Sequence, residues 1–501
     1  MLKDKTVVLG ITGGIAAYKA ADLASKLTQA GAKVETIMTE SATKFITPVT
    51  LRGVTGRGVV TTMWDLSGPF SIEHVALAEA ADIVVIAPAT ANTIAKIANG
   101  IADDILSCTV LATKAPIVIA PAMHYNMWEN PVTQENIAEL KVRGFTIVGP
   151  GYGHLASGDV GWGRLIENEV IIANINKILG KNGDLAGKCI VVTAGGTSEP
   201  IDPVRILTNR SSGKMGFAVA EAARDRGANV KLIIGSVSAA IPVGVDVTRI
   251  ETAAEMLDAA VKETAGCDAL IMTAAVADYM PKKTAAQKIK KETTGNMTID
   301  LIKTPDILTE VSGGKFVKVG FAAESEHLLE NAKDKLIRKK LDMVVANDIT
   351  RSDSGFGTDT NKVWFVNLGD KVEDLPLMTK REVADKVLDR VVEIITENSK
   401  SNGQPTSFDI KLKAGYIERH YLPVSQKYRG LFPDYKTDFV IESDTGNIET
   451  NAGLCKNNDY CSLEIRKGMT KWYRKNPELK PGSIIRFTVE PLKKYRLEIV
   501  K

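Results

Sequence analysis

Short apolar runs rich in β-branched residues recur along the chain, and two of them open the same larger pattern. Each run ends at a pair of glycines, after which an alanine-rich stretch has helical spacing and a Gly-Ala-x-Val segment leads into another apolar run. Strand, helix and strand in this order form a βαβ unit. The runs are Thr6–Thr12 and Cys189–Ala194, the helices Ile15–Thr28 and Gly216–Arg226, and the later segments Gly31–Val34 and Gly227–Val230.

Further apolar runs have the length and composition of buried strands. Each of them ends in small or polar residues, and in open α/β sheets ligands collect at the carboxyl ends of the strands. The chain therefore predicts an α/β fold with two doubly wound, mainly parallel sheets. These further runs are Asp82–Ala87, Ala115–Ala120, Ala269–Ala274, Lys318–Ala322 and Met343–Ala346.

Two segments are typical of linkers and divide the chain into three expected domains. Lys181–Gly187 and Thr396–Thr406 are rich in Asn, Gly, Ser and other polar residues, without an apolar period. Beyond the second linker the pattern changes to short alternating runs with aromatic residues and no long helix. We therefore expect α/β domains over residues 1–180 and 188–396, and a small β-barrel-like domain over 407–501.

Charge is unevenly distributed. The 501 residues include 63 Lys and Arg against 60 Asp and Glu, a net charge of +3. From Pro405 on there are 18 basic and 12 acidic side chains, so this part carries +6 while the preceding 404 residues are slightly acidic. A basic tail is compatible with nucleic acid as a partner, but also with a solvated surface or a protein-docking module.

Cysteine usage and hydropathy point to the cytoplasm. The chain has 5 cysteines, and their spacing suggests neither disulfide pairs nor a zinc site, so we expect free thiols in a reducing compartment. The first residues lead directly into a strand-like run without the apolar core of a signal peptide. No run is long enough to span a bilayer, so no membrane association is expected.

A polar, glycine-punctuated turn follows the strand-like run Cys189–Ala194. It contains Gly195 and Gly196, Ile-Asp-Pro-Val-Arg at 201–205 and Asn-Arg-Ser-Ser-Gly-Lys-Met-Gly at 209–216. Glycines allow backbone N–H groups to approach a phosphate, and a helix start adds partial positive charge, to which Lys214 would add a full charge. Such turns also occur as plain strand–helix connections, and this alternative stays open on the turn alone.

The whole run resembles the signature of the phosphopantothenate–cysteine ligase family, and the resemblance extends from Gly187 to Ile395. It is strengthened by Ala-Ala-Val-Ala-Asp-Tyr at 274–279, Gln-Lys-Ile-Lys-Lys at 287–291 and Lys-Thr-Pro-Asp-Ile-Leu at 303–308. Members form an amide by activating a carboxylate with a nucleotide, which is CTP in bacterial relatives. Thr304 stands where many members have Asn.

The ligase resemblance implies a role for individual residues. Asn209 acts on the acyl-nucleotide intermediate, and Lys288 lies on a loop that closes over the phosphates. Asp278 is a candidate ligand for Mg²⁺, a hard cation that prefers carboxylate oxygen. The expected nucleotide-binding residues are Gly195, Gly196, Asp278, Lys288, Asp306, Phe321, Ala323, Lys335 and Lys339.

The first glycine turn, Gly-Ile-Thr-Gly-Gly-Ile-Ala-Ala at 10–17, lacks the dinucleotide spacing and suits a mononucleotide phosphate instead. From about residue 5 to 175 the chain resembles flavoproteins that decarboxylate cysteine thiols, in particular phosphopantothenoylcysteine decarboxylases. The motifs include Ile-Glu-His-Val-Ala-Leu at 72–77, Pro-Ala-Met-His-Tyr-Asn-Met at 121–127 and Gly-Asp-x-Gly-x-Gly-Arg at 158–164.

The decarboxylase resemblance implies FMN, held between the subunits of a trimeric unit, with His74 as the catalytic base. A cysteine carboxylate has no electron sink for the carbanion left by CO₂ loss, and oxidation of the thiol to a thioaldehyde creates one. A histidine with a pKa near neutral suits removal of the thiol proton. The expected cofactor-binding residues are Gly13, Gly14, Thr39, Pro88, Ala89, Thr90, Asn92 and Ser107.

Two further candidate catalytic positions depart from the family pattern. His124 stands where many members have an Asn that contacts the substrate carboxylate. Ser157 stands where many members have a Cys that donates a proton in the final reduction, and a hydroxyl is a far weaker acid than a thiol, whose pKa is about 8.5. Cys108 is present elsewhere in this domain, where a small buried hydrophobic role is the simpler interpretation.

The C-terminal region resembles the DNA-binding pseudobarrel class in Lys-Gly-Met-Thr-Lys-Trp-Tyr at 467–473 and the Pro-Gly turn at 481–482. Trp472, Tyr473, Arg474 and Lys475 place aromatic rings beside charges, as nucleic-acid surfaces do. The solvated or docking interpretation stays open beside it.

Together these features predict a bifunctional enzyme of coenzyme A biosynthesis that forms homo-oligomers, with trimeric flavin units and dimeric ligase units. It would join 4′-phosphopantothenate to L-cysteine with CTP and then decarboxylate the product to 4′-phosphopantetheine. Two alternatives remain: an active ligase with an impaired flavin domain, and a nucleic-acid-binding protein that keeps the enzyme halves as a scaffold.

Overall fold

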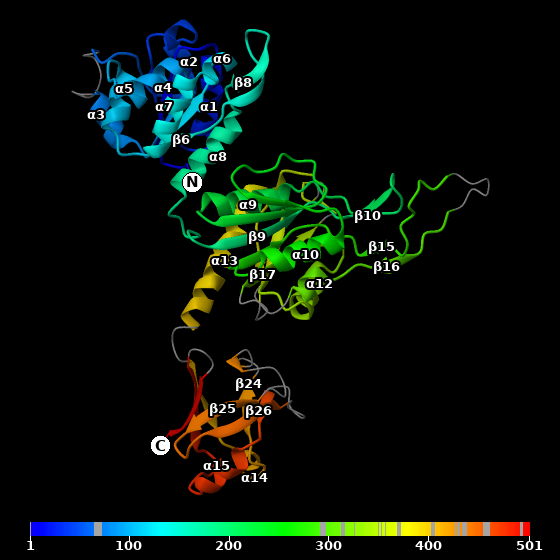
Figure 1. The fold of residues 1–501 in the computed structure, drawn as a ribbon. Coiled ribbons are helices and arrows are strands. Elements are labelled where there is room, and N and C mark those ends of the chain that lie inside the picture. Colours follow the sequence, from blue (N-terminus) through cyan, green and yellow to red (C-terminus); the bar gives the residue numbers. More distant parts are fainter. Residues whose placement is uncertain are drawn as a thin grey trace. The chain divides into compact units, whose positions relative to one another are not determined.

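The chain forms two compact units, Met1–Val392 and Glu393–Lys501, in a computed structural model (Figure 1). The structure describes residues 2–64, 73–290, 297–311, 316–324, 326–348, 350–351, 353–355, 357–367, 372–401, 406–425, 428, 431–432, 438–453, 461–490 and 494–500. The first unit contains two large α/β sheets, of six and eight strands, and the second contains one seven-stranded sheet. The expected fold class is confirmed.

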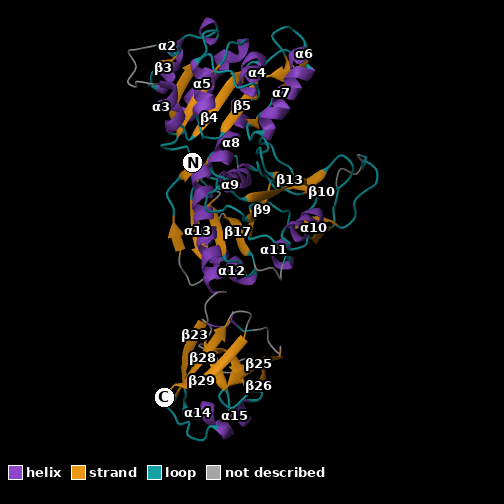
Figure 2. Cartoon of the chain, turned by 60° about the vertical axis from the view of Figure 1, so that its left-hand side comes forward, coloured by secondary structure: helices purple, strands orange, loops and turns teal. Residues whose placement is uncertain are grey.

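The first sheet has six parallel strands in the order β3-β2-β1-β4-β5-β6. Its central strands are buried on both faces: Val7, Leu9 and Ile11 pack into one core, and Val8 with its neighbours in β4 packs into the other. Helices cover both faces for this reason (Figure 2). The strands are β1 (Thr6–Ile11), β2 (Lys33–Met38), β3 (Val59–Val60), β4 (Ile83–Ala89), β5 (Ile117–Pro121) and β6 (Thr146–Ile147).

Helices follow the strands of this domain, and an antiparallel ribbon departs from the α/β pattern. They are η1 (Ile15–Tyr18), α1 (Lys19–Gln29), η2 (Ala42–Lys44), α2 (Pro48–Thr55), α3 (Glu73–Ala80), α4 (Ala91–Ala98), α5 (Ile105–Ala112), α6 (Tyr125–Trp128), α7 (Pro131–Val142) and α8 (Asn168–Leu179). The ribbon pairs β7 (Gly151–His154) with β8 (Val160–Arg164) in antiparallel fashion.

The second sheet has eight strands in the order β13-β12-β9-β14-β17-β18-β20-β21. The first six are parallel, and β20 and β21 add antiparallel at one edge. These strands are β9 (Cys189–Ala194), β12 (Asn229–Ile234), β13 (Asp246–Arg249), β14 (Ala269–Met272), β17 (Val317–Glu324), β18 (Met343–Asp348), β20 (Val363–Asn367) and β21 (Val372–Asp374).

Helices and short ribbons complete the second α/β domain. The helices are α9 (Lys214–Asp225), α10 (Ala253–Glu263), α11 (Ile307–Glu310), α12 (Leu328–Arg338) and α13 (Lys380–Ser401). Two ribbons project from the sheet, β10 (Ser198–Pro200) with β11 (Ile206–Thr208) and β15 (Tyr279–Pro281) with β16 (Leu301–Lys303), as Figure 1 shows. A third, short ribbon pairs β19 (Thr360–Asn361) with β22 (Met378–Thr379).

Most expected elements have their predicted places, with two differences in the helices. The stretch expected as one helix over Ile15–Thr28 begins with a 3₁₀ turn and becomes α-helical at Lys19. The expected linker Thr396–Thr406 is too long, because α13 continues to Ser401. Polar residues with no apolar period can still be helical when a packed helix propagates into them.

The expectation of free thiols is wrong for two of the cysteines. Cys189 and Cys267 form a disulfide, with their Cα atoms 4.8 Å apart and a sequence separation of 78. Cys189 begins β9, and Cys267 immediately precedes the neighbouring parallel strand β14, so both lie at the same end of the sheet. Sequence spacing could not reveal a proximity that parallel pairing creates. Cys108 is free.

The second unit is a seven-stranded sheet with two short helices that lie together at one end (Figures 1 and 2). Trp472 and Tyr473 are buried in its core, so the expected aromatic surface beside Arg474 and Lys475 is wrong. The strand order is β23-β28-β29-β25-β26-β27-β24. The elements are β23 (Thr406–Lys411), α14 (Ala414–Glu418), β24 (Leu422–Ser425), β25 (Asp438–Ser443), β26 (Ile448–Gly453), β27 (Cys461–Ile465), α15 (Met469–Lys475), β28 (Ile484–Glu490) and β29 (Lys494–Val500).

Among the residues that the structure describes, no helix combines the length and the apolar character needed to cross a bilayer.

A buried ion pair holds α13 against α9 in the second α/β domain. The fully buried carboxylate of Asp225 accepts hydrogen bonds from Arg224 at 2.6 Å and from Arg381 at 2.8 Å. Asp225→Ala would leave two guanidinium groups without their common partner, so we expect it to lower the unfolding free energy by about 3–5 kcal/mol.

Hydrogen exchange of the β9 amides would measure this loss, since these amides open only when the second sheet unfolds. Asp353→Ala in the same domain is the matched control: its carboxylate is exposed and pairs with Arg351 at 2.8 Å, so the change should cost less than about 1 kcal/mol. Equal effects of the two substitutions would contradict the prediction.

Candidate active sites

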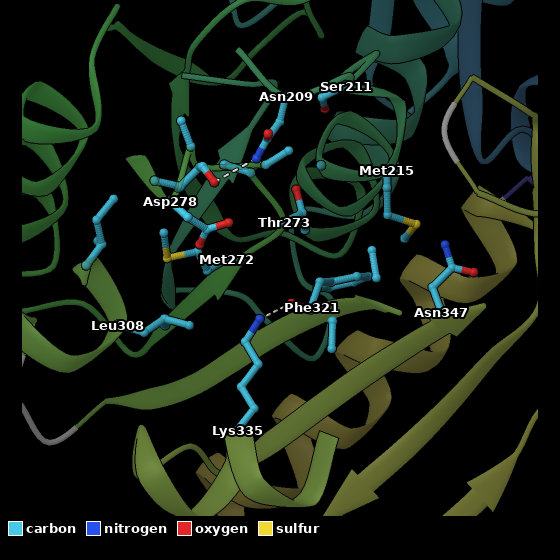
Figure 3. Close-up of a pocket in the computed structure, with 18 of the residues that line it drawn as sticks. Asn209, Ser211, Met215, Met272, Thr273, Asp278, Leu308, Phe321, Lys335 and Asn347 are labelled. Carbon is cyan, nitrogen blue, oxygen red and sulfur yellow. Dashed lines mark hydrogen bonds between the residues drawn. The ribbon is translucent and has the colours of Figure 1, made fainter. Parts of the chain in front are cut away.

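A cavity of about 1050 Å³ opens at the carboxyl ends of the parallel strands in the second α/β domain. It lies where the strand order reverses, since β12 is on one side of β9 and β14 is on the other. The start of α9 forms one wall, and α12 brings Lys335 to another (Figure 3). This cavity contains seven of the expected residues: Asn209, Asp278, Asp306, Phe321, Ala323, Lys335 and Lys339.

Three expected nucleotide-binding residues are outside the lining of this cavity. Gly195 and Gly196 lie behind it, and a Cβ at Gly195, where φ is +83°, would come within 2.6 Å of the Ser236 carbonyl oxygen. These glycines therefore serve close backbone packing in this structure. Lys288 is exposed on the segment after β15, and the backbone of its neighbour Ile289 is held by hydrogen bonds to Asp202 and Arg205.

Asn209 and Asp278 lie close together on one side of the cavity (Figure 3). The Asn209 side-chain amide donates to the Val276 carbonyl oxygen at 2.9 Å, which orients the amide at the mouth. Asp278 is exposed, and the described residues contain no group of three or more His, Cys, Asp or Glu that could hold a metal ion.

Lys335 and Lys339 reach the cavity from the last turn of α12 and from the residue after it, and their ammonium groups differ. Lys335 donates to the Phe321 carbonyl oxygen at 2.7 Å, and burial together with the nearby Lys339 lowers the pKa of Lys335 to about 8. Lys339 pairs with Asp306 at 3.0 Å. Although burial opposes ionisation of the Asp306 carboxyl, the hydrogen bond from Lys339 and its charge lower the pKa of that group.

Two further lysines line the cavity, and one of them, Lys380, was missed by motif analysis. Lys214, expected as a phosphate-binding charge, lines the cavity but pairs with Asp359 at 2.7 Å. Lys380 begins α13, and its buried ammonium donates to the carbonyl oxygens of Gly355 and Thr358, while burial lowers its pKa. Lys380 belongs to no recognisable motif, so no signal in the sequence could have identified it.

A second cavity, of about 610 Å³, lies at the carboxyl ends of the strands in the first sheet. It is formed by the turns after β1, β4 and β5 and by the β7–β8 ribbon. Apolar side chains dominate its lining, which suits a flat aromatic ring, and glycine turns with backbone N–H groups suit a phosphate. It contains five of the expected residues: Gly13, Gly14, Thr90, His124 and Ser157.

The other expected flavin residues are distributed around this cavity or away from it. Pro88 and Ala89 end β4, and Thr39 and Asn92 follow β2 and β4; none of the four lines the cavity. The Thr12 hydroxyl connects two of these turns, donating to the Pro88 carbonyl oxygen at 2.7 Å and accepting from the Thr90 N–H at 3.0 Å.

Ser107 and His74 are not brought to this cavity. Asp104 is the N-cap of α5, and the Ser107 side chain completes the capping box. Ser107 also lines a different cavity, together with Lys114 and Arg143. His74 lies in α3, which packs against α5. A single subunit therefore does not assemble the whole set of residues expected for the flavin site.

The two candidate residues that depart from the family pattern share one partner. His124 Nε2 lies 3.1 Å from Asp159 Oδ2, and the Ser157 hydroxyl donates to the same oxygen at 2.9 Å. His124 Nδ1 accepts the Asn126 N–H at 3.3 Å, so the ring proton lies on Nε2. The hydrogen bonds from His124 and Ser157 lower the pKa of Asp159, which stays a carboxylate at neutral pH.

Comparison with protein families separates the same two domains. Residues 1–180 match the family described as "Flavoprotein", and residues 185–395 match the "DNA/pantothenate metabolism flavoprotein C-terminal domain". Together with the two cavities, these matches define a flavoprotein fused to a second enzymatic domain of pantothenate metabolism.

Full-length relatives make the family specific. The chain is 44% identical over 409 residues to the coenzyme A biosynthesis bifunctional protein CoaBC of Bacillus subtilis, covering 81% of this chain and all of the relative. It is 42% identical over 397 residues to the Escherichia coli protein of the same name, covering 78% of this chain and 97% of that one. The chain belongs to this family of bifunctional coenzyme A biosynthesis enzymes, which combine a decarboxylase and a ligase.

Solved structures match the two domains separately. The C-terminal domain of a CoaBC protein is 38% identical, with a TM-score of 0.37, and covers 43% of this chain and 99% of its own. The FMN-dependent cysteine decarboxylase SpaF is 34% identical, with a TM-score of 0.32, and covers 36% of this chain and 97% of its own.

The lowered pKa of Lys335 predicts how nucleotide binding depends on pH. Phosphates bind the ammonium form, which predominates below the pKa of about 8 and is lost as pH rises through that value. We expect CTP affinity to fall by about tenfold between pH 8 and pH 9.5. The reason is that the fraction of Lys335 in the ammonium form falls by up to about tenfold for each pH unit above the pKa.

Isothermal titration calorimetry with CTP across this pH range would measure the effect. Lys335→Arg should flatten the profile, because a guanidinium keeps its charge throughout. An unchanged slope in the arginine variant would show that another group titrates.

Proposed function

We propose that the second α/β domain activates the carboxylate of 4′-phosphopantothenate with CTP. The carboxylate oxygen attacks the α-phosphorus, pyrophosphate leaves and an acyl-cytidylate forms; the amine of L-cysteine then displaces CMP to form the amide. The observation that carries this proposal is the gathering of Asn209, Asp278, Lys335 and Lys339 in one cavity. Cations stabilise the charge that builds up on the transferring phosphate, and an oriented amide can stabilise the acyl intermediate.

Mg²⁺ is part of this proposal. Asp278 supplies one exposed carboxylate at the end of its strand, and the phosphates of the nucleotide would supply the remaining oxygens, as in other sites where Mg²⁺ is held by few protein groups. Lys288 stands outside the cavity and reaches the phosphates by movement of its loop. In this movement Ile289 stays in place, because its backbone is hydrogen-bonded to Asp202 and Arg205, and Lys288 turns about that point.

The first domain binds FMN and decarboxylates 4′-phosphopantothenoylcysteine to 4′-phosphopantetheine in this proposal. FMN supplies a two-electron sink for oxidation of the thiol. Gly13, Gly14 and Thr90 would hold it in the apolar cavity, and His74 would take the thiol proton. Since His74 and Ser107 lie away from that cavity in their own subunit, the site is completed between subunits. This division supports oligomeric flavin units; that these are trimers and that the ligase domains form dimers belong to the proposal through the family resemblance.

The domain boundaries 1–180, 188–396 and 407–501 and action in the cytoplasm belong to the same proposal. We do not propose a nucleic-acid-binding function for the C-terminal unit. Its Trp472 and Tyr473 are buried, and several of its basic side chains pair with acidic ones, Arg486 with Asp409 and Lys467 with Asp438 among them.

Product analysis tests the whole proposal. The flavin-loaded protein incubated with 4′-phosphopantothenate, cysteine, CTP and Mg²⁺ should yield 4′-phosphopantetheine, CO₂, CMP and pyrophosphate. Formation of the amide without CO₂ would instead favour an active ligase with an impaired flavin domain.

We expect Asn209→Ala or Lys288→Ala to reduce ligase turnover by about 10²-fold or more, because each removes a group that stabilises the reacting phosphate or acyl intermediate. Flavin content should be unchanged, since both residues lie in the other domain. Pyrophosphate release and flavin absorbance measure the two effects. Lys290→Ala, two positions along the same loop, is the matched control, and equal loss in that variant would contradict a specific role for Lys288.

His74→Asn should leave FMN bound and abolish CO₂ release from 4′-phosphopantothenoylcysteine. The substitution removes the base without changing the glycine turns that hold the cofactor. Flavin absorbance and trapping of ¹⁴CO₂ measure the two properties, and CO₂ release near the wild-type rate would exclude His74 as the base.

A further inference from the structure

Completion of the decarboxylase cycle requires an acid in the flavin cavity, given the proposed function of that domain. Loss of CO₂ from the thioaldehyde leaves the bonding electron pair on carbon, delocalised onto sulfur as an enethiolate. A proton must then add to the carbon that lost CO₂, and the hydride removed earlier must return to the carbon that bears sulfur. Ser157 cannot supply the proton, because its hydroxyl is a very weak acid and is already donated to Asp159.

Few cavity-lining groups can act as this acid at neutral pH. The described ionisable side chains in the lining are Tyr18, Lys19, His124, His154 and Arg164. Phenol, ammonium and guanidinium groups ordinarily hold their protons to about pH 10 or above, whereas an imidazole has a pKa of about 6.5. Among the side chains of this lining, the choice is therefore between the two histidines; His74, which takes the thiol proton in the proposed function, lies outside it.

Hydrogen bonds occupy both ring nitrogens of His124. Nδ1 accepts the Asn126 N–H and Nε2 donates to Asp159, so protonation of Nδ1 would place two N–H groups against each other. The ring is also the cap of α6, whose first amide it satisfies. His124 is thus built to donate one fixed hydrogen bond and is poorly suited to exchange protons.

His154 is in the opposite situation. Among the described residues, no hydrogen bond or ion pair engages its ring, and the side chain is exposed, so solvent can recharge it after each turnover. It ends β7, three residues before Ser157, and both residues line the cavity.

The ribbon that carries His154 is held rigidly. One face consists of glycines laid directly on the core: a Cβ at Gly163 would come within 2.1 Å of the Met123 carbonyl oxygen, and one at Gly161 within 2.9 Å of the Tyr125 Cβ. His154 pairs with Val160 at the end of the same ribbon. Its backbone position relative to the cavity is therefore fixed by close packing.

We propose that His154 is the acid that protonates the carbon from which CO₂ departs, in place of a thiol at position 157. Its imidazolium gives one proton to carbon and becomes neutral, the returned hydride converts the carbon–sulfur double bond to a thiolate, and solvent restores the proton to His154. His124 and Asp159 bind and orient, without supplying the proton.

A single turnover of the flavin-loaded chain under anaerobic conditions tests the assignment. With 4′-phosphopantothenoylcysteine, wild-type protein should form thiol product and CO₂ in equal amounts and return to oxidised flavin. His154→Gln should release at most one CO₂ per flavin, retain reduced flavin and accumulate a product two hydrogens lighter, with thiol formation slowed about 10²-fold or more. Adding Ser157→Cys to this variant should restore thiol formation.

Three outcomes of the same experiment would overturn the assignment. They are full thiol formation by His154→Gln, accumulation of the lighter product by His124→Gln but not by His154→Gln, and failure of Ser157→Cys to rescue. Wild-type protein that stops at the lighter product would also overturn it, while leaving the oxidative half of the decarboxylase intact. Wild-type protein that releases no CO₂ would instead contradict the proposed function of the domain.

The ring states of the two histidines provide a readout that needs no turnover. In flavin-free protein, ¹⁵N NMR of the imidazoles should show His154 averaging between its two neutral tautomers. His124 should remain with its proton on Nε2. A single fixed tautomer for His154 would overturn the proposal even if the variant were inactive for another reason.

Discussion

Successive strands can pair in parallel only when the chain crosses back to the same end of the sheet before each new strand. In both α/β domains this requirement collects the carboxyl ends of the strands at one end of the sheet. The first strand, β1 or β9, lies in the interior of its sheet, with later strands added on either side. The connections therefore diverge above that strand and leave a crevice. In the second domain, contact between α9 and the sheet depends on Gly216, where a Cβ would lie 2.5 Å from both Ala194 and Thr273.

The two cavities differ in how complete they are within one chain. The ligase cavity contains most of the residues expected for it: Asn209 directly follows β11, Asp278 lies between β14 and β15, and Phe321 lies within β17, and all three line one crevice. The residues expected for the flavin site are divided. Some line the cavity, Ser107 lies in the capping box of α5, and His74 lies in α3. Strand ends alone bring together only the part of that site that follows β1, β4 and β5.

Sequence analysis could predict what short-range pattern determines. Cys189–Ala194 was predicted residue for residue as a strand, because a run buried on both faces is continuously apolar. The paired thiols of Cys189 and Cys267 and the lining role of Lys380 depend on packing between distant segments, which no local pattern encodes. Trp472 and Tyr473 beside Arg474 and Lys475 misled for a related reason: in a helix, two adjacent residues can face the core while the next two face solvent.

The apolar stripe of α13 has a consequence for how such a chain can grow. Val383, Ala384, Val387, Leu388 and Val391 are buried at helical spacing, and the boundary between the compact units follows immediately, at Val392. One residue inserted within this stripe would rotate every stripe residue after it by about 100°, out of the core. The same insertion after Glu393 leaves these five side chains in register. The core of the ligase domain thus fixes the spacing of α13 as far as Val391, and a change in chain length between the two compact units keeps this core intact only beyond that residue.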